Sequence, residues 1–129
     1  MFALGRQANE NPPKLHAFDA KGFRSDRIEF HPAYHRLMGE SVAAGLHGST
    51  WADTGRHAPP PAEVTRAARF YMAAQVETGH LCPITMTRAA LGALVAEPSV
   101  AAKVLPKVLT RSYDAAFVPF WEKSGMTLG

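Results

Sequence analysis

The stretch HPAYHRLMGESVAAGLHG, residues 31–48, decides the fold class of this chain. Pro32 suits the first position of a helix, because the amide hydrogen that proline lacks would have no partner there. Gly45 and Gly48 suit the end of the same helix, where glycine readily adopts a left-handed conformation. Between these ends, apolar side chains recur at the spacing of one helix face. They are Tyr34, Leu37, Met38, Val42 and Leu46.

Three further helices are predicted after this one, over about residues 61–78, 83–97 and 99–111. The helix at 61–78 is apolar around most of its circumference, as a helix is when it is buried centrally or covered by a partner. Its apolar side chains are Val64, Ala67, Ala68, Phe70, Tyr71, Met72, Ala74 and Val76. Pro106 lies inside the last of the three helices, so we expect either a kink there or two shorter helices.

The other segments show no helical period. Residues 9–13 and 19–22 are rich in turn-forming Asn, Pro, Asp and Gly, so we interpret residues 1–30 as an irregular segment. Residues 48–61 form a polar connector within the helical part, which spans residues 31–124. Residues 125–129 look like the beginning of a β-strand. The predicted fold class is therefore all-α, with about four helices and the start of a strand at the C-terminal end.

The composition is that of one ordinary domain, with 129 residues of which 47% are apolar. Charged residues make up 19%, below the usual ~25%, which fits a chain partly covered by another chain or domain. The single cysteine excludes an internal disulfide framework and a multi-cysteine zinc site, and it favours a cytoplasmic location. No apolar run approaches the ~20 residues that span a bilayer, so we expect no membrane partner.

Several residues have side chains that could bind a metal ion or act as a nucleophile. His31 and His35 are four residues apart, a spacing at which two imidazoles can share a metal ion. No third ligand stands nearby, so we interpret them as capping or surface histidines and predict no metal site. Cys82 follows His80 at a helix start, where a thiol could be activated as a nucleophile. Its neighbours are apolar, so we interpret Cys82 as a buried, inert side chain and predict no catalytic residue.

The segment Cys82-Pro-Ile-Thr-Met-Thr87 is also a candidate lining for a ligand cleft, through Cys82, Thr85 and Met86. Two interpretations stay open. The hydroxyl groups and the thioether could face a ligand at the start of the helix. Alternatively, the threonines could bond to the helix backbone while Met86 fills the core.

Six stretches, taken together, resemble one family in order and spacing. They are Leu4-Gly-Arg-Gln-Ala-Asn-Glu-Asn-Pro-Pro13, Phe30-His-Pro-Ala-Tyr-His35, Ala67-Ala-Arg-Phe70, Gln75-Val-Glu-Thr-Gly79, Leu81-Cys-Pro-Ile-Thr-Met-Thr87 and Arg111-Ser-Tyr-Asp114. They resemble the N-terminal part of the AidB-type, or adaptive-response, branch of the acyl-CoA dehydrogenase flavoproteins. The segment around Leu105-Pro106-Lys107 is also similar to the last helix of the N-terminal domain in acyl-CoA dehydrogenases generally.

The resemblance implies an N-terminal helical domain that packs against a middle β-domain and a C-terminal four-helix bundle, with FAD between those parts. Family members oxidise CH–CH bonds of acyl-CoA with FAD, and the AidB branch is associated with the response to DNA alkylation. The family's flavin-binding segment would begin just past Gly129, and residues 125–129 match the strand that enters it. The resemblance therefore implies a truncated domain with no cofactor-binding residues, inactive and without FAD on its own.

The resemblance also implies that the helix starting at Cys82 and Pro83 forms one wall of the cleft above the flavin in a complete homologue. Two other functions stay open. The broad apolar circumference at residues 62–78 fits an interaction module that docks on a partner or self-associates. The net charge of +3 and the pI near 9.3 are compatible with a DNA-associating module, although basic and acidic residues are interspersed along the chain.

Overall fold

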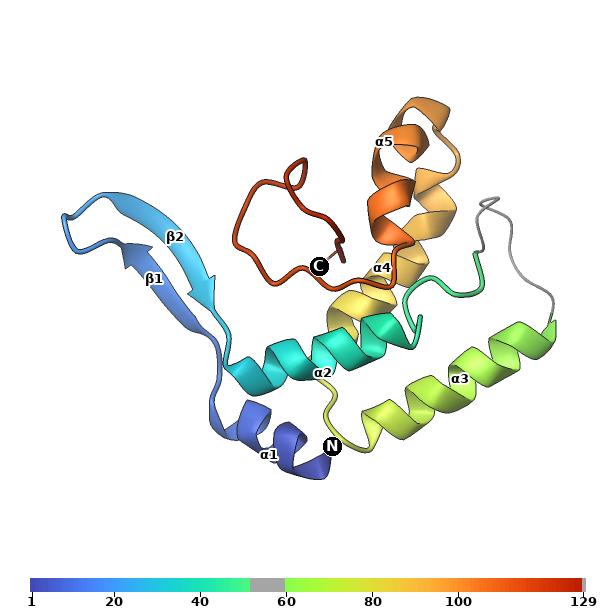
Figure 1. Cartoon of the computed structure of the whole chain (residues 1–129), viewed down its shortest axis with the longest axis horizontal. Coiled ribbons are helices and arrows are strands. Elements are labelled where there is room, and N and C mark those ends of the chain that lie inside the picture. Colours follow the sequence, from blue (N-terminus) through green and yellow to red (C-terminus); the bar gives the residue numbers. More distant parts are fainter. Residues whose placement is uncertain (52–59, 129) are drawn as a thin grey trace.

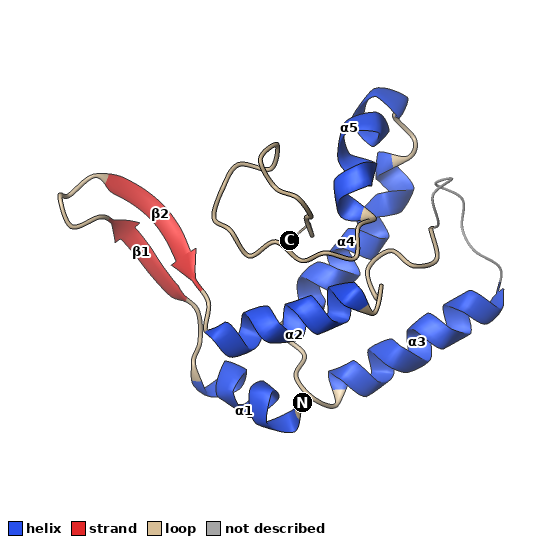
Figure 2. Cartoon of the chain, viewed as in Figure 1, coloured by secondary structure: helices blue, strands red, loops and turns tan. Residues whose placement is uncertain are grey.

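The computed structural model describes residues 1–51 and 60–128, and Figure 1 and Figure 2 show the arrangement of its elements. The chain is mostly helical, as predicted. The elements in order are α1 (Phe2–Glu10), β1 (Lys14–Phe18), β2 (Arg24–Glu29), α2 (Pro32–Ala43), α3 (Pro60–Ala74), α4 (Leu81–Leu94) and α5 (Pro98–Val108). Most of the predicted connector, residues 52–59, lies outside the described residues.

The core lies where α2 meets α4. In Figure 1, α1 packs on α2, α2 crosses α4, and α4 pairs with α5. The central buried cluster comes from α2, its following turn and the first turn of α4. Its members are Met38, Val42, Leu46, Leu81 and Ile84. Side chains from the last turns of α3 and Tyr113 from the C-terminal segment close the cluster at its edges.

Helix α2 forms as the sequence predicts. The His31 side chain accepts a hydrogen bond from the Ala33 amide through Nδ1 at 3.2 Å. His31 therefore caps the helix, in agreement with its interpretation as a capping histidine. Gly45 has a φ of 71° and ends the helix in the left-handed conformation. The Leu46 amide then donates back to the Ser41 carbonyl at 3.1 Å, which satisfies one of the last helical carbonyls.

The interpretation of residues 1–30 as irregular is wrong, because they form α1 and an antiparallel β1–β2 hairpin. The predicted turn at 19–22 is present: Asp19 Oδ1 accepts from the Lys21 and Phe23 amides, and Gly22 has a φ of 83°. Residues 27–30 alternate polar and apolar side chains, but this stretch is too short to predict a strand. Both faces of the hairpin are largely exposed, apolar residues included. Helix α1 is short and depends on packing against α2 rather than on its own pattern.

In the second half, the expectation of a strand from residue 125 is wrong, and of the two alternatives for Pro106, a kink or two short helices, the second is excluded. Residues 125–128 form no strand; the Met126 amide donates to the Lys107 carbonyl at 3.1 Å and the Leu128 amide to Thr87 Oγ1 at 2.7 Å. A helix-end carbonyl and a side chain thus take the hydrogen bonds that a strand would give to a sheet neighbour. Helix α5 is one helix that includes Pro106, not two short ones.

Gly5 tests how closely α1 approaches the rest of the fold. A methyl group added there would collide with the main-chain carbonyl of Val76, whereas one added at Gly39 in α2 would meet no atom within 4 Å. We expect Gly5→Ala to lower the free energy of unfolding by about 1–3 kcal/mol through overpacking. The matched Gly39→Ala should be neutral or stabilising by up to ~1 kcal/mol, because alanine favours a helix. Urea denaturation measures both, and equal effects would contradict the close α1 contact.

Candidate functional site

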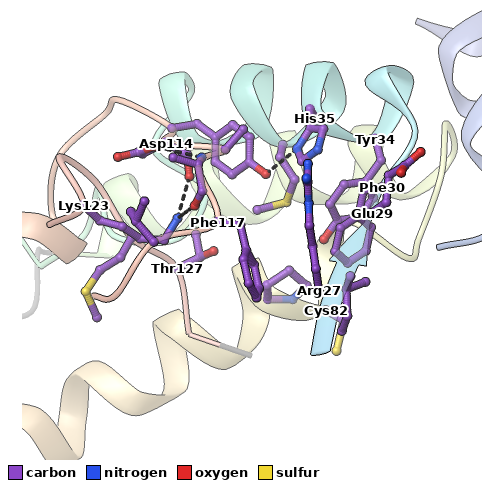
Figure 3. A pocket seen from close by; sticks show the side chains of 18 of the residues that line it. Arg27, Glu29, Phe30, Tyr34, His35, Cys82, Asp114, Phe117, Lys123 and Thr127 are labelled. Carbon is purple, nitrogen blue, oxygen red and sulfur yellow. Dashed lines mark hydrogen bonds between the residues drawn. The ribbon is translucent and has the colours of Figure 1, made fainter. Parts of the chain in front are cut away.

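A cleft of about 770 Å³ opens between β2, the start of α2, the start of α4 and the segment 113–127. Its walls combine aromatic rings, sulfur atoms and charged groups, as Figure 3 shows. The aromatic and sulfur-bearing residues are Phe30, Tyr34, His35, Tyr113, Phe117, Met38, Cys82, Met86 and Met126. The charged residues are Arg27, Glu29, Asp114 and Lys123. A largely apolar cleft of this size with a few polar groups is typical of a ligand site.

An aromatic cluster forms one side of the cleft. Phe30 and Tyr34 stack with centroids 4.3 Å apart, and the His35 ring lies edge-on to both. The Tyr113 hydroxyl and His35 Nδ1 are 2.8 Å apart. Burial, aided by Tyr34 and Asp114, raises the pKa of Tyr113 to about 12, while burial and then Lys123 lower the pKa of His35. At neutral pH both groups are therefore uncharged, and the tautomer of the imidazole sets which of the two donates.

The charged residues on the opposite side are engaged in holding their own segment. Lys123 Nζ donates to the carbonyls of Asp114 at 3.0 Å and Ala116 at 2.6 Å. The Asp114 carboxylate accepts from the Ala116 and Ser124 amides and from the Ser124 hydroxyl. Hydrogen bonds from these amides lower the pKa of Asp114. The two side chains thus shape the segment and are not poised as a general acid and base.

The three residues predicted to line a cleft lie on the first turns of α4. Cys82 and Met86 line the cleft, with their sulfur atoms 3.9 Å apart. Thr85 lines a smaller groove of about 310 Å³ between α3 and α4, which Cys82 and Met86 also border. All three side chains are exposed, so the interpretation of Cys82 as a buried side chain is wrong, and Met86 does not fill the core.

Ile84 and Thr87 show why the turn is oriented this way. Both are fully buried, so they fix the face of α4 that meets the core and leave Cys82 on the other side. Thr87 bonds to the helix backbone as one interpretation proposed, because its hydroxyl donates to the Pro83 carbonyl at 2.6 Å.

His80 lies in a buried hydrogen-bonded chain that the sequence did not reveal. Its Nε2 is 3.0 Å from the Ser41 hydroxyl of α2, and its Nδ1 is 2.8 Å from the Glu77 carboxylate. Glu77 also accepts from the His80 and Gly79 amides. Because the carboxylate takes Nδ1–H, Nε2 is the acceptor and Ser41 donates to it.

Serine, histidine and a carboxylate in this order have the connectivity of a nucleophile relay, but substrate cannot reach them. Ser41 is 5% exposed, His80 1% and Glu77 7%. Burial favours a higher pKa for Glu77, yet the hydrogen bonds from His80 and Gly79 outweigh it, so the pKa is lowered. The three residues therefore act as a structural connection between α2 and the turn before α4. In the sequence, the spacing of Glu77 and His80, three residues apart, was the available signal for this hydrogen-bonded chain, but no sequence feature related Ser41 to them.

Among the residues that the structure describes, no set of metal ligands comes together. His31 caps α2 and His35 bonds to Tyr113, so the two do not share an ion. Across residues 1–51 and 60–128, no group of three His, Cys, Asp or Glu side chains is placed to hold a metal. Within the same part of the chain, none of the helices has the length and apolar character needed to cross a membrane.

Two solved structures share this arrangement. The apo-form of Bd2924 superposes with a TM-score of 0.76 at 25% identity, covering 86% of this chain and 22% of that one. Caenorhabditis elegans ACDH-11 in complex with C11-CoA gives a TM-score of 0.71 at 22% identity, covering 85% of this chain and 19% of that one. The second likeness shows the fold alone. The class of protein that these matches define is a mostly helical domain that forms about a fifth of a larger chain.

The sequence comparison is more specific. The family model for the adaptive response protein AidB N-terminal domain matches residues 1–115. The chain is also 42% identical over 127 residues to the putative acyl-CoA dehydrogenase AidB of Escherichia coli K12. This chain thus belongs to the AidB N-terminal domain family. The match covers 98% of the chain and 23% of the relative, so the chain spans about a quarter of that protein's length.

The buried chain through His80 predicts an acid-sensitive contribution to stability. The pKa of folded Glu77 is lowered, so its contribution is present above the unfolded value, near 4.5, and is lost as the pH falls through the folded value. At pH 7 we expect Glu77→Gln to lower the free energy of unfolding by about 1.5–3 kcal/mol, the usual range for hydrogen bonds to a charged group. The difference from the unmodified chain should shrink below pH 4.5.

Urea denaturation at a series of pH values measures this difference. Glu122→Gln is the matched control, because Glu122 is exposed in the C-terminal segment and its carboxylate makes no contact that holds the fold. It should change the free energy of unfolding little at any pH. A Glu77→Gln difference that stays constant from pH 3 to 7 would contradict an ionised Glu77 in the folded state.

Proposed function

We propose that this chain serves as the N-terminal helical domain of an AidB-like flavoprotein, where it forms one wall of the ligand cleft and a platform for the other domains. The observation that carries the proposal is the 42% identity to AidB over nearly the whole chain. Exposed apolar side chains on several elements support it, since large exposed apolar surface on a domain marks an interaction site.

Helix α3 supplies the clearest docking face. Its sequence suggested a helix either central or covered by a partner, yet Val64, Tyr71 and Met72 are 68–69% exposed. Phe70 and Ala73 on another side of the helix join the core cluster. When a helix has apolar residues on both sides and only one side is buried, the other side exposes apolar surface to water, which is unfavourable. A neighbouring domain that covers this side would remove the exposure. The exposed side therefore fits a surface covered in the larger protein.

The first turns of α4 would provide the cleft wall. Cys82 and Met86 face the cleft and Thr85 the adjoining α3–α4 groove, so these residues form a ridge between two concave surfaces. Apolar and sulfur-bearing side chains on such a ridge suit an acyl chain rather than a polar ligand. ACDH-11, which shares the fold, is in complex with C11-CoA, a ligand with such a chain.

Acyl-CoA dehydrogenases generally depend on FAD, a cofactor that accepts a hydride, but the polar groups described in this chain do not fit a flavin site. Lys123 and Asp114 are occupied within their own segment, and the Met126 amide donates to Lys107. We therefore derive no step through FAD and propose that its contacts come from the rest of the flavoprotein. The exposed thiol of Cys82 fits the reducing cytoplasm, where we place the protein.

A chimera tests the proposal. This chain would replace the corresponding region of Escherichia coli AidB, and the purified product would be examined for flavin retained through gel filtration. We expect the chimera to retain flavin and the isolated chain mixed with FAD to retain none. Stoichiometric flavin on the isolated chain would contradict the assignment of the flavin contacts.

Variants of α3 locate the docking face. We expect Val64→Gln, Tyr71→Gln and Met72→Gln together to leave the stability of the isolated chain within about 0.5 kcal/mol, because all three are exposed. In the chimera the same changes should abolish flavin retention. Arg69→Gln, also exposed on α3, is the control and should retain it. Flavin retention by the triple variant equal to that of the control would show that this face does not dock.

A further inference from the structure

The segment that forms one wall of the cleft is a loop whose two ends lie in contact with each other. It begins at Ser112, a few residues after the end of α5, and ends at Gly125. Figure 1 shows that it arches between the hairpin and the α4–α5 pair. Gly125 is buried so tightly on Ser112 that an added methyl group would collide with the Ser112 carbonyl oxygen. Loops whose ends meet in this way and carry no regular structure behave as compact units. We call residues 112–125 the strap.

Polar contacts give the strap a shape of its own. Lys123 and Asp114 join its two limbs through the hydrogen bonds described above. Lys107 of α5 donates to the carbonyls of Phe120 at 3.1 Å and Trp121 at 2.6 Å. The tip of the strap is therefore tied to α5, while residues 113–118 are the part that stands against the cleft.

One hydrogen bond joins that part of the strap to the other side of the cleft in the described residues, between the Tyr113 hydroxyl and His35 Nδ1 at 2.8 Å. Apart from the Tyr113 ring, which packs at the edge of the core cluster, apolar packing adds little, because Phe117 is 64% exposed and Val118 38%. Figure 3 shows Phe117 beside the cleft and the dashed bond to His35 above it. Segments with few buried apolar contacts open at low free-energy cost.

We propose that residues 113–118 form a lid on the cleft, latched by the Tyr113–His35 hydrogen bond and pivoting at the Ser112–Gly125 contact. Breaking the latch removes the hydrogen bond from the lid to α2, while the Lys123 and Asp114 bonds keep the lid joined to the other limb of the strap. The α2–α4 core is not disturbed, since Tyr113 contacts that core only at its edge. Opening widens access to the stacked Phe30–Tyr34 pair and to Cys82. The use of the lid to admit a ligand rests on the proposed function, whereas the latch itself does not.

Relaxation-dispersion NMR on the 129-residue chain tests the latch, because it measures the population of a minor open state. Tyr113→Phe keeps the ring and removes the hydroxyl, so we expect the open population to rise roughly three- to tenfold, the effect of losing one hydrogen bond. The exchange should be confined to the amides of residues 113–118 and the ring protons of Tyr34. Tyr71→Phe, at an exposed tyrosine of α3, is the control and should leave the population unchanged.

An equal open population in Tyr113→Phe and the unmodified chain would overturn the proposal. So would exchange that rises equally at buried Val108 of α5 and Leu37 of α2, since that result indicates global loosening. His35→Gln is a second variant in case Tyr113→Phe folds poorly, and it should raise the same local exchange. A chimera that fails to retain flavin would overturn the proposed function and leave this result unaffected.

Discussion

The contact between α2 and α4, fixed by the buried chain from Ser41 through His80 to Glu77, is the constraint on which the rest of this domain depends. An imidazole and a carboxylate in an apolar interior are costly unless every polar atom is paired. Here the carboxylate accepts from two amides and a ring nitrogen, and the remaining ring nitrogen accepts from Ser41. A satisfied network of this kind allows one relative placement of the two helices, because any slip leaves a buried group unpaired.

That placement determines the cleft. Helix α2 carries Tyr34, His35 and Met38 on one side, and the first turns of α4 carry Cys82 and Met86 on the other. His80 immediately precedes α4 and Ser41 lies near the end of α2, so the hydrogen-bonded chain joins the two walls away from the opening. The strap then completes the cleft through Tyr113, which reaches both His35 and the edge of the apolar core. The geometry of the site thus follows from a structural network that does not itself contact a ligand.

The sequence predicted the helices of residues 31–108 because each carries its own period or capping residue, as Pro32, His31 and Gly45 do for α2. Helix α1 was missed because it depends on packing against α2, and the hairpin was missed because its exposed strands carry no long alternating pattern. Gly5 contributes no apolar pattern, only the space for α1 to approach Val76. At the site, the composition around Cys82 indicated a lining. His35 and Tyr113 lie 78 positions apart, and no local pattern relates two residues at that separation.

The distribution of apolar residues explains how this domain can fold around a core and still expose apolar faces to solvent. Its central cluster is small and lies on one side of α3, while Tyr71 and Met72 remain open to solvent on the other. The hairpin extends from the helices with Leu15, Phe18 and Phe23 exposed, and a two-stranded hairpin alone is marginal in water. A small domain has a small free energy of unfolding, and contacts that cover these faces would increase it. Helix α3 therefore has two roles, since one side closes the core of this chain and the other is available to complete a larger one.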